Sequence, residues 1–169
     1  MISARPTRGW RYVRKRITPF LWFASEAEEA AQFYVSIFPN SKINSVTRYG
    51  DAGPGPKGTA MTVGFELDGE PFVALNGQQQ IPFSGAVSFV INCATQAEVD
   101  HYWDKLGAGG KTQQCGWLSD KYGIPWQVVP TALPQLLQDP DKSKAGRVMQ
   151  AMLKMTKIEV ATLQQAAAS

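Results

Sequence analysis

Gly123-Ile124-Pro125-Trp126-Gln127-Val128-Val129 repeats the pattern of an earlier stretch, Gly69-Glu70-Pro71-Phe72-Val73-Ala74-Leu75. Two further segments match in the same order. Ser25-Glu26-Ala27-Glu28 opens one apolar helical run, and Thr95-Gln96-Ala97-Glu98 opens another. A helix start and a strand that recur in the same order indicate an internal duplication. We therefore expect two similar halves, over about residues 17–77 and 86–130.

Each half shows one strand, a capped helix and then three strands. Ser25 with Glu28, and Thr95 with Glu98, have the spacing of a capping box, and Asp68-Gly69 between apolar runs is a strong hairpin signal. The expected strands of the first half are residues 17–23, 42–49, 59–67 and 70–75, and those of the second lie within residues 86–93, 111–118 and 124–129. The hydrophobic spacing thus predicts a βαβββ plan twice over.

The chain turns helical after Pro130. Asp139 is the expected N-cap of one helix, with Pro140 at its first position, and residues 158–167 are expected in a last helix. We assign residues 17–160 to the folded domain and residues 161–169 to a tail.

The composition is that of an ordinary globular protein. The chain has 169 residues, of which 44% are hydrophobic and 18% charged. It contains neither an apolar run of the roughly 18 residues that a membrane span needs nor the apolar core of a secretory signal, so a cytoplasmic location is expected. Cys93 and Cys115 are the two cysteines, and they suggest no disulfide framework.

The basic residues are concentrated at the N-terminus. Residues 1–16 hold six of the 17 basic residues and none of the 14 acidic ones. Such an arm can contact nucleic acid or an anionic membrane through counterion release. A flexible extension is the other interpretation, which we favour because so short an arm rarely folds alone.

Several long segments carry a resemblance to a known family. They are residues 17–23, 33–41, 72–77 and 114–127. They resemble PhnB-like proteins, often labelled 3-demethylubiquinone 3-methyltransferase-like, in the vicinal oxygen chelate (glyoxalase, bleomycin resistance and dioxygenase) superfamily. The resemblance implies an α+β fold of glyoxalase-like tandem βαβββ modules with curved mixed sheets, followed by C-terminal helices. It also implies a homodimer.

The resemblance also indicates where a metal ligand would lie. In many metal-dependent members, an Asp-x-x-Gly turn leads into a strand whose fourth position after Gly is a Glu ligand. Here Asp120-Lys121-Tyr122-Gly123 leads to Gln127, which lacks the charge that holds a cation. The single histidine, His101, falls in a helical segment. We expect no cofactor and no tightly bound metal, while weak divalent binding stays open.

The candidate ligand-binding residues are amides, aromatic side chains and one thiol. They are Trp22, Phe72, Asn76, Phe89, Cys115, Trp117, Trp126 and Gln127. Asn76 and Gln127 either form an amide pair for polar ligand groups or satisfy buried polar atoms. The aromatic residues either line a pocket or form the core. Cys115 is either a reactive thiol or an inert buried one, and the lack of a neighbouring base favours the latter.

Two functions compete at this level. The first is binding of a small organic molecule in an apolar, aromatic cavity without turnover. The second is an enzyme of the superfamily that acts on a small electrophilic or aromatic substrate, with Gln127 and Asn76 orienting it. Methyl transfer fits poorly, because a doubly wound methyltransferase needs a strand, a Gly-rich loop and a helix in that order, whereas Gly107-Ala108-Gly109-Gly110 follows a helix.

Overall fold

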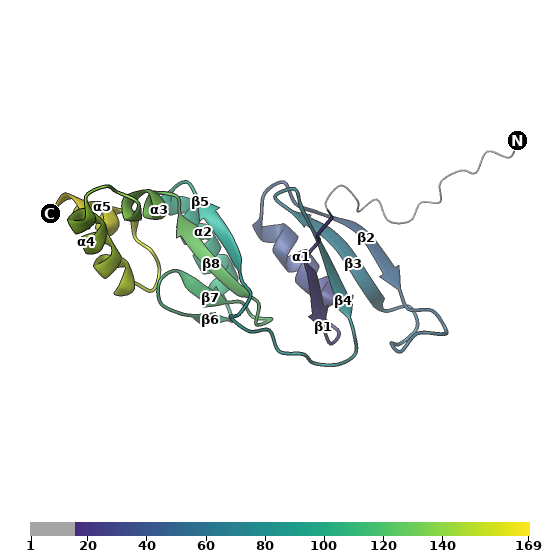
Figure 1. Ribbon diagram of the computed structural model, residues 1–169. Coiled ribbons are helices and arrows are strands. Elements are labelled where there is room, and N and C mark those ends of the chain that lie inside the picture. The colour runs from purple at the N-terminus through teal and green to yellow at the C-terminus, as the bar shows by residue number, and fades with distance from the viewer. Residues whose placement is uncertain (1–15) are drawn as a thin grey trace, which may run out of the picture. The chain divides into compact units, whose positions relative to one another are not determined.

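The computed structural model describes residues 16–169, and the chain divides into two compact units between Ile81 and Pro82 (Figure 1). Each unit contains a four-stranded sheet with a helix after its first strand. Almost all of the basic arm lies outside the described residues. None of the helices between residues 16 and 169 has the length and apolar character to cross a bilayer.

The first unit follows the βαβββ plan. Its elements are β1 (Phe20–Phe23), α1 (Ala27–Ile37), β2 (Lys42–Arg48), β3 (Ala60–Leu67) and β4 (Glu70–Asn76). The strand order is β1-β4-β3-β2, with β1 parallel to β4 and the other pairs antiparallel. Asp68 and Gly69 have φ values of 47° and 79° at the hairpin between β3 and β4. Those values confirm the Asp-Gly turn, which needs positive φ at both positions.

Helix α1 packs on one face of the first sheet through aromatic residues. The Tyr34 ring stacks 6.3 Å from that of Phe65, which in turn lies 5.4 Å from Phe72. Phe72 is therefore a core residue beneath α1, which is the packing alternative of its two interpretations. Side chains alternate along a strand, so Val73 and Trp22 lie on the opposite face.

The second unit repeats the plan with shorter strands. Its elements are β5 (Phe89–Cys93), α2 (Gln96–Gly107), β6 (Lys111–Thr112), β7 (Trp117–Ser119) and β8 (Pro125–Pro130). The strand order is β5-β8-β7-β6, and β5 is parallel to β8. A tight turn separates β6 from β7. Gly116 has φ 79° there, and a Cβ would lie 2.7 Å from the Val128 carbonyl oxygen, so only glycine fits.

Three C-terminal helices complete the second unit (Figure 1). They are α3 (Ala132–Leu137), α4 (Lys142–Leu153) and α5 (Val160–Ala168). Their shared core consists of Leu133, Val148, Ile158, Leu163 and Ala167. Residues 161–169 are therefore not a separate tail, since Leu163 and Ala167 bury α5 in this core.

The N-cap of α4 is Asp141 rather than Asp139. The Asp141 carboxylate accepts from the backbone N–H groups of Ser143 and Lys144 at 2.9 and 3.2 Å. Asp139 instead accepts from the Asp141 N–H and forms an ion pair with Lys144 at 2.6 Å. The expectation placed the cap two residues too early, because two aspartates flank Pro140 and only the second reaches the free N–H groups.

The capping boxes have different outcomes in the two units. Thr95 accepts from the Glu98 N–H at 3.2 Å, which confirms the Thr95 cap, and the Glu98 carboxylate completes the second box by accepting at 2.6 Å from the N–H of Ala94, one residue before the N-cap. In the first unit, Glu26 occupies the N-cap position and its side chain makes no capping bond. The Ser25 box is therefore wrong, and α1 begins one residue later relative to the repeat.

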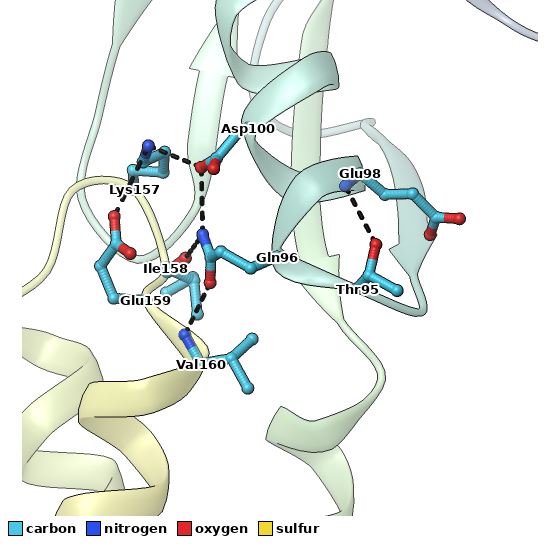
Figure 2. Close-up of polar contacts among 8 residues, drawn as sticks. All are labelled: Thr95, Gln96, Glu98, Asp100, Lys157, Ile158, Glu159 and Val160. Atoms are coloured by element: carbon cyan, nitrogen blue, oxygen red, sulfur yellow. Dashed lines mark hydrogen bonds and ion pairs between the residues drawn. The ribbon is translucent and has the colours of Figure 1, made fainter.

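The helix start of α2 also anchors the chain that leads into α5. Gln96 Nε2 donates to the Ile158 carbonyl at 3.1 Å, and Gln96 Oε1 accepts from the Val160 N–H at 2.8 Å. Figure 2 shows Asp100 beside this amide, with Lys157 donating to its carboxylate at 2.6 Å. These contacts fix the C-terminal helices to the second sheet unit.

Candidate functional site

The strand register sorts the second sheet into two faces. Phe89 pairs with Trp126 and Cys93 with Pro130, so these four side chains share one face. Burial and the nearby Glu98 carboxylate at the start of α2 raise the pKa of the Cys93 thiol to about 11. This face is therefore the one that α2 covers.

Trp126 and Phe89 belong to the core beneath α2. Trp126 is only 3% exposed, its ring lies 5.4 Å from Phe89, and its indole N–H donates to Asp120 Oδ2 at 2.8 Å. The other carboxylate oxygen of Asp120 accepts from the backbone N–H groups of Tyr122 and Ile124. The Asp-x-x-Gly turn thus anchors Trp126, and both aromatic residues follow the packing alternative.

The opposite face presents a row of three different side chains. Gln127 on the central strand pairs with Trp117 on β7 and with Val90 on β5. Directly paired residues of neighbouring strands lie on the same face, with Cβ atoms about 5 Å apart. Val90 is 50% exposed, while Trp117 and Gln127 are half-buried. Aromatic, amide and aliphatic groups thus lie side by side and reach solvent.

A hydroxyl group outside the row holds the central amide. Gln127 Nε2 donates to Ser88 Oγ, just before β5, at 2.9 Å. Further along the same face, Asn92 is exposed, and Val129 packs against the core of the C-terminal helices. We call Ser88, Val90, Trp117 and Gln127 the amide face.

The amide face carries no charge of its own. The strands β5, β7 and β8 contain no Asp, Glu, Lys, Arg or His. Lys111 is the nearest strand residue with a charge on this sheet, and it lies on the edge strand β6 opposite Ser119. Because Ser119 faces the same way as Trp117, Lys111 lies on the same side of the sheet, but at its edge, so a ligand on the row itself meets dipoles and apolar atoms.

Asn76 has a structural role in the first unit. Its Oδ1 accepts from the Ala27 N–H at the start of α1 at 2.8 Å, and its Nδ2 donates to the Ala60 carbonyl at 3.0 Å. The Tyr49 hydroxyl donates to its backbone carbonyl. Asn76 and Gln127 thus each bond within their own unit, and the Asn76 amide is used to satisfy buried backbone groups.

Trp22 and Cys115 are engaged in holding loops. The Trp22 indole N–H donates to the Gln79 carbonyl at 2.8 Å, and a Cβ on Gly77 would lie 2.0 Å from its ring. The Cys115 N–H donates to the Met155 carbonyl at 2.8 Å, and its sulfur lies 3.8 Å from the Met152 carbonyl. The Trp22 side chain therefore holds the segment after β4, whereas Cys115 holds the segment at Met155 through its backbone N–H.

Comparison with known proteins places the chain in a family. The family model of 3-demethylubiquinone-9 3-methyltransferase matches residues 15–129. The PhnB protein from Bacillus cereus shares 36% identity over 69% of this chain and 100% of its own, with a TM-score of 0.65. The chain belongs to the PhnB-like 3-demethylubiquinone-9 3-methyltransferase family. Its two βαβββ units and C-terminal helices are the glyoxalase-like fold of that family.

A more distant structure supports the fold alone. Protein PA1353 from Pseudomonas aeruginosa is 22% identical over 68% of this chain and 96% of its own, with a TM-score of 0.57. Among curated proteins, no relative matches the chain. Membership of the PhnB-like family establishes architecture, whereas chemistry has to be argued from the site.

The position where the family resemblance would place a metal ligand carries an amide. At the position where metal-dependent members of the superfamily have Glu, Gln127 is hydrogen-bonded to Ser88. His101 is exposed on α2, with its ring 5.1 Å from that of Tyr102. Across residues 16–169, no three His, Cys, Asp or Glu side chains come together in a way that could hold an ion.

Sequence reasoning missed Ser88, Val90 and the bond by which Asp120 holds Trp126. The strand period would have separated Gln127 from Trp126, because adjacent residues on a strand face opposite ways. It would also have assigned Val90 to the face of Gln127 once the parallel pairing of β5 with β8 was assumed. The hydrogen bond from Gln127 to Ser88 joins positions that are 39 residues apart, and no local sequence pattern predicts it.

Proposed function

We propose that this PhnB-like protein binds a small, uncharged organic molecule with a planar ring on the amide face of the second sheet. The single observation that carries the proposal is the row of Trp117, Gln127 and Val90 across three neighbouring strands. An indole offers a surface on which a planar ring stacks, and an amide fixes the orientation of a polar group.

Binding without chemical conversion is the form of this function that we favour. General acid–base and nucleophilic catalysis require a titratable side chain within reach of the reacting atom. The strands β5, β7 and β8 supply no acid, base or imidazole to the amide face. Cys93 faces α2 instead, and its pKa of about 11 keeps the thiol protonated.

Methyl transfer is not part of the proposal despite the family's name. The Gly-rich stretch 107–110 follows α2 and leads to the two-residue strand β6. A nucleotide-like cofactor in the common methyltransferase fold binds where a glycine loop joins a strand to the N-terminus of a helix. The order of elements here is the reverse.

Native mass spectrometry of freshly purified full-length protein tests the function. A bound organic molecule that is recovered unchanged after incubation supports binding, whereas a chemically altered molecule would favour the enzymatic alternative. The same spectra report bound metal, and the number of subunits tests the homodimer that the family resemblance implies.

A titration with a defined fragment supplies a second test. Indole is a planar, uncharged probe, and its dissociation constant can be measured by NMR. We expect Trp117→Ala to weaken indole binding by about 3- to 10-fold, the range of a single aromatic contact. Gln135→Ala, which removes an exposed amide on α3, is the matched control and should leave the dissociation constant unchanged. Equal constants for all three proteins would contradict the proposed site.

A further inference from the structure

We infer that the ligand of the amide face donates a hydrogen bond to Gln127, and that Ser88 is the positioning residue that selects such ligands. This inference rests on the proposed function and specifies its ligand class. The class is an uncharged planar aromatic molecule that carries an N–H or O–H group at its edge.

The first step is the direction in which the Gln127 amide points. Its Nε2 group donates to Ser88 Oγ at 2.9 Å, at the β5 side of the sheet. Within the part of the chain that the structure describes, no group donates to Gln127 Oε1. An amide oxygen has two lone pairs and only accepts. The half-buried side chain therefore offers an unused acceptor.

The second step is the neighbourhood of that acceptor. Trp117 lies beside Gln127 on β7, and Val90 lies beside it on β5. A ring stacked on the Trp117 indole brings its edge toward the central strand, where Gln127 lies. A ring edge with an N–H or O–H group forms a hydrogen bond to Oε1. A ring edge that carries only a lone pair is repelled by the lone pairs of Oε1.

The third step is the absence of charge. An ionised ligand on the row of Trp117, Gln127 and Val90 would lose hydration without meeting an opposite charge on these three strands, since β5, β7 and β8 carry none and Lys111 lies at the sheet edge. An uncharged donor loses less hydration and gains one hydrogen bond. A net hydrogen bond between neutral groups favours the donor by roughly 3- to 10-fold in affinity.

The corresponding positions of the first sheet lack the amide and the indole. The register places Val73 where the second sheet has Gln127, Gly64 where it has Trp117, and Phe20 where it has Val90. The ligand class is therefore specific to the second unit, although the backbone plan is shared.

Indole and benzofuran test the inference, because they have the same shape but only indole has a ring N–H donor. We expect the wild-type protein to bind indole about 3- to 10-fold more tightly than benzofuran. Gln127→Ala should abolish the preference. Ser88→Ala should reduce it, because the amide is then free to rotate, and Ser88→Thr should restore it by returning a hydroxyl group.

The NMR signals of the Gln127 side-chain NH₂ group provide a readout that a merely structural effect would not move. They should shift on indole binding in the wild type and in Ser88→Thr. Equal or tighter binding of benzofuran, or a preference that survives Gln127→Ala, would overturn the inference and leave the proposed function standing. Failure of both probes to bind would overturn the proposed function and the inference together.

Discussion

The two units share one backbone plan but use their amides in opposite ways. In the first unit, the amide at the end of the central strand, Asn76, is buried and holds the start of α1. The corresponding strand end in the second unit is Pro130, and Thr95 caps α2 locally instead. The second unit has its amide three residues earlier, at Gln127, on the face away from the helix.

This difference shows how a duplicated module can free a central strand from holding the neighbouring helix. Where a helix start depends on an amide from a distant strand, the residue at the end of that strand is needed for folding. A helix that caps itself leaves the strand free to vary. In the second unit, the Thr95–Glu98 box and the Gln96 contacts with the C-terminal segment supply the local order (Figure 2). Gln127 is then available to the solvent side of the sheet.

The largest expected effect is the loss of Asn76. Asn76→Ala leaves the Ala27 N–H and the Ala60 carbonyl without their buried partner, which should lower the free energy of unfolding by about 2–3 kcal/mol. Urea unfolding measures the change in the free energy of unfolding. Hydrogen exchange measures the loss of protection in α1, with the backbone amides of α2 as an internal reference.

Asn44→Ala is the control for the Asn76 experiment. The Asn44 amide is exposed and bonds to Glu66 at 2.9 Å, so its removal should change stability by less than about 0.5 kcal/mol. If α1 kept its protection against exchange in Asn76→Ala, the structural role of Asn76 and the contrast between the units would both be wrong.

Exchanging the central residues of the two sheets tests the contrast directly. Val73 is 5% exposed, so Val73→Gln buries an amide at a cost of about 1–3 kcal/mol. Gln127→Val places a β-branched residue at a half-exposed strand position and should change stability by less than about 0.5 kcal/mol. It should nevertheless remove the preference for indole over benzofuran.

Thermal unfolding of the two exchange variants, measured side by side with wild type, gives the comparison. The expected pattern is a clear loss in the melting temperature for Val73→Gln and little change for Gln127→Val. Equal losses would mean that Gln127 supports the fold as much as Val73 does. That result would contradict the proposal that the amide face is a binding surface.

The next effect comes from the two helix starts. Thr95→Ala removes a side-chain cap and should lower the free energy of unfolding by about 1 kcal/mol, whereas Thr95→Ser should retain it. Ser25→Ala is the matched change in the first unit and should have almost no effect, because α1 is held by Asn76. A cost for Ser25→Ala as large as that of Thr95→Ala, measured by urea unfolding, would restore the first capping box.

Much of the architecture was predictable because its signals are local. The repeated strand and helix starts, the Asp68-Gly69 hairpin and the helical spacing of residues 95–106 each depend on neighbours in sequence, and the structure confirms the βαβββ order in both units. The split between β6 and β7 was not resolved, because Cys115 and Gly116 form their turn only with Met155 and Thr156 as partners.

The site was less predictable because its contacts are distant in sequence. Asn76 bonds to Ala27 across 49 positions, and a capping box at Ser25 looks complete without it. Trp126 and Gln127 were grouped together, although the strand turns them to opposite faces. The C-terminal residues looked like a tail because α5 is short, and its burial depends on a core that five separate residues assemble.

The smallest expected effect is the pH dependence of the contact that holds α5, for which the first unit has no counterpart. The hydrogen bond from Lys157, and then that from Gln96, lower the pKa of Asp100, while Asp100 raises the pKa of Lys157. The stabilising effect of Asp100 is therefore present above its unfolded pKa of about 3.9 and is lost as pH falls through its lower folded pKa. The stabilising effect of Lys157, whose pKa is raised, is lost only in strongly alkaline solution.

The Asp100 carboxylate is 43% exposed, so solvent screening limits its contribution to about 0.5 kcal/mol or less. Urea unfolding at pH 7 and pH 2.5, compared between wild type and Asp100→Asn, measures that share. We expect the wild type to be slightly more stable at pH 7 and the difference to shrink at pH 2.5, because the contribution of Asp100 is lost as pH falls through its lowered folded pKa. A difference that persisted unchanged at pH 2.5 would show that the Gln96 amide alone holds α5 against α2 and that the ion pair adds nothing.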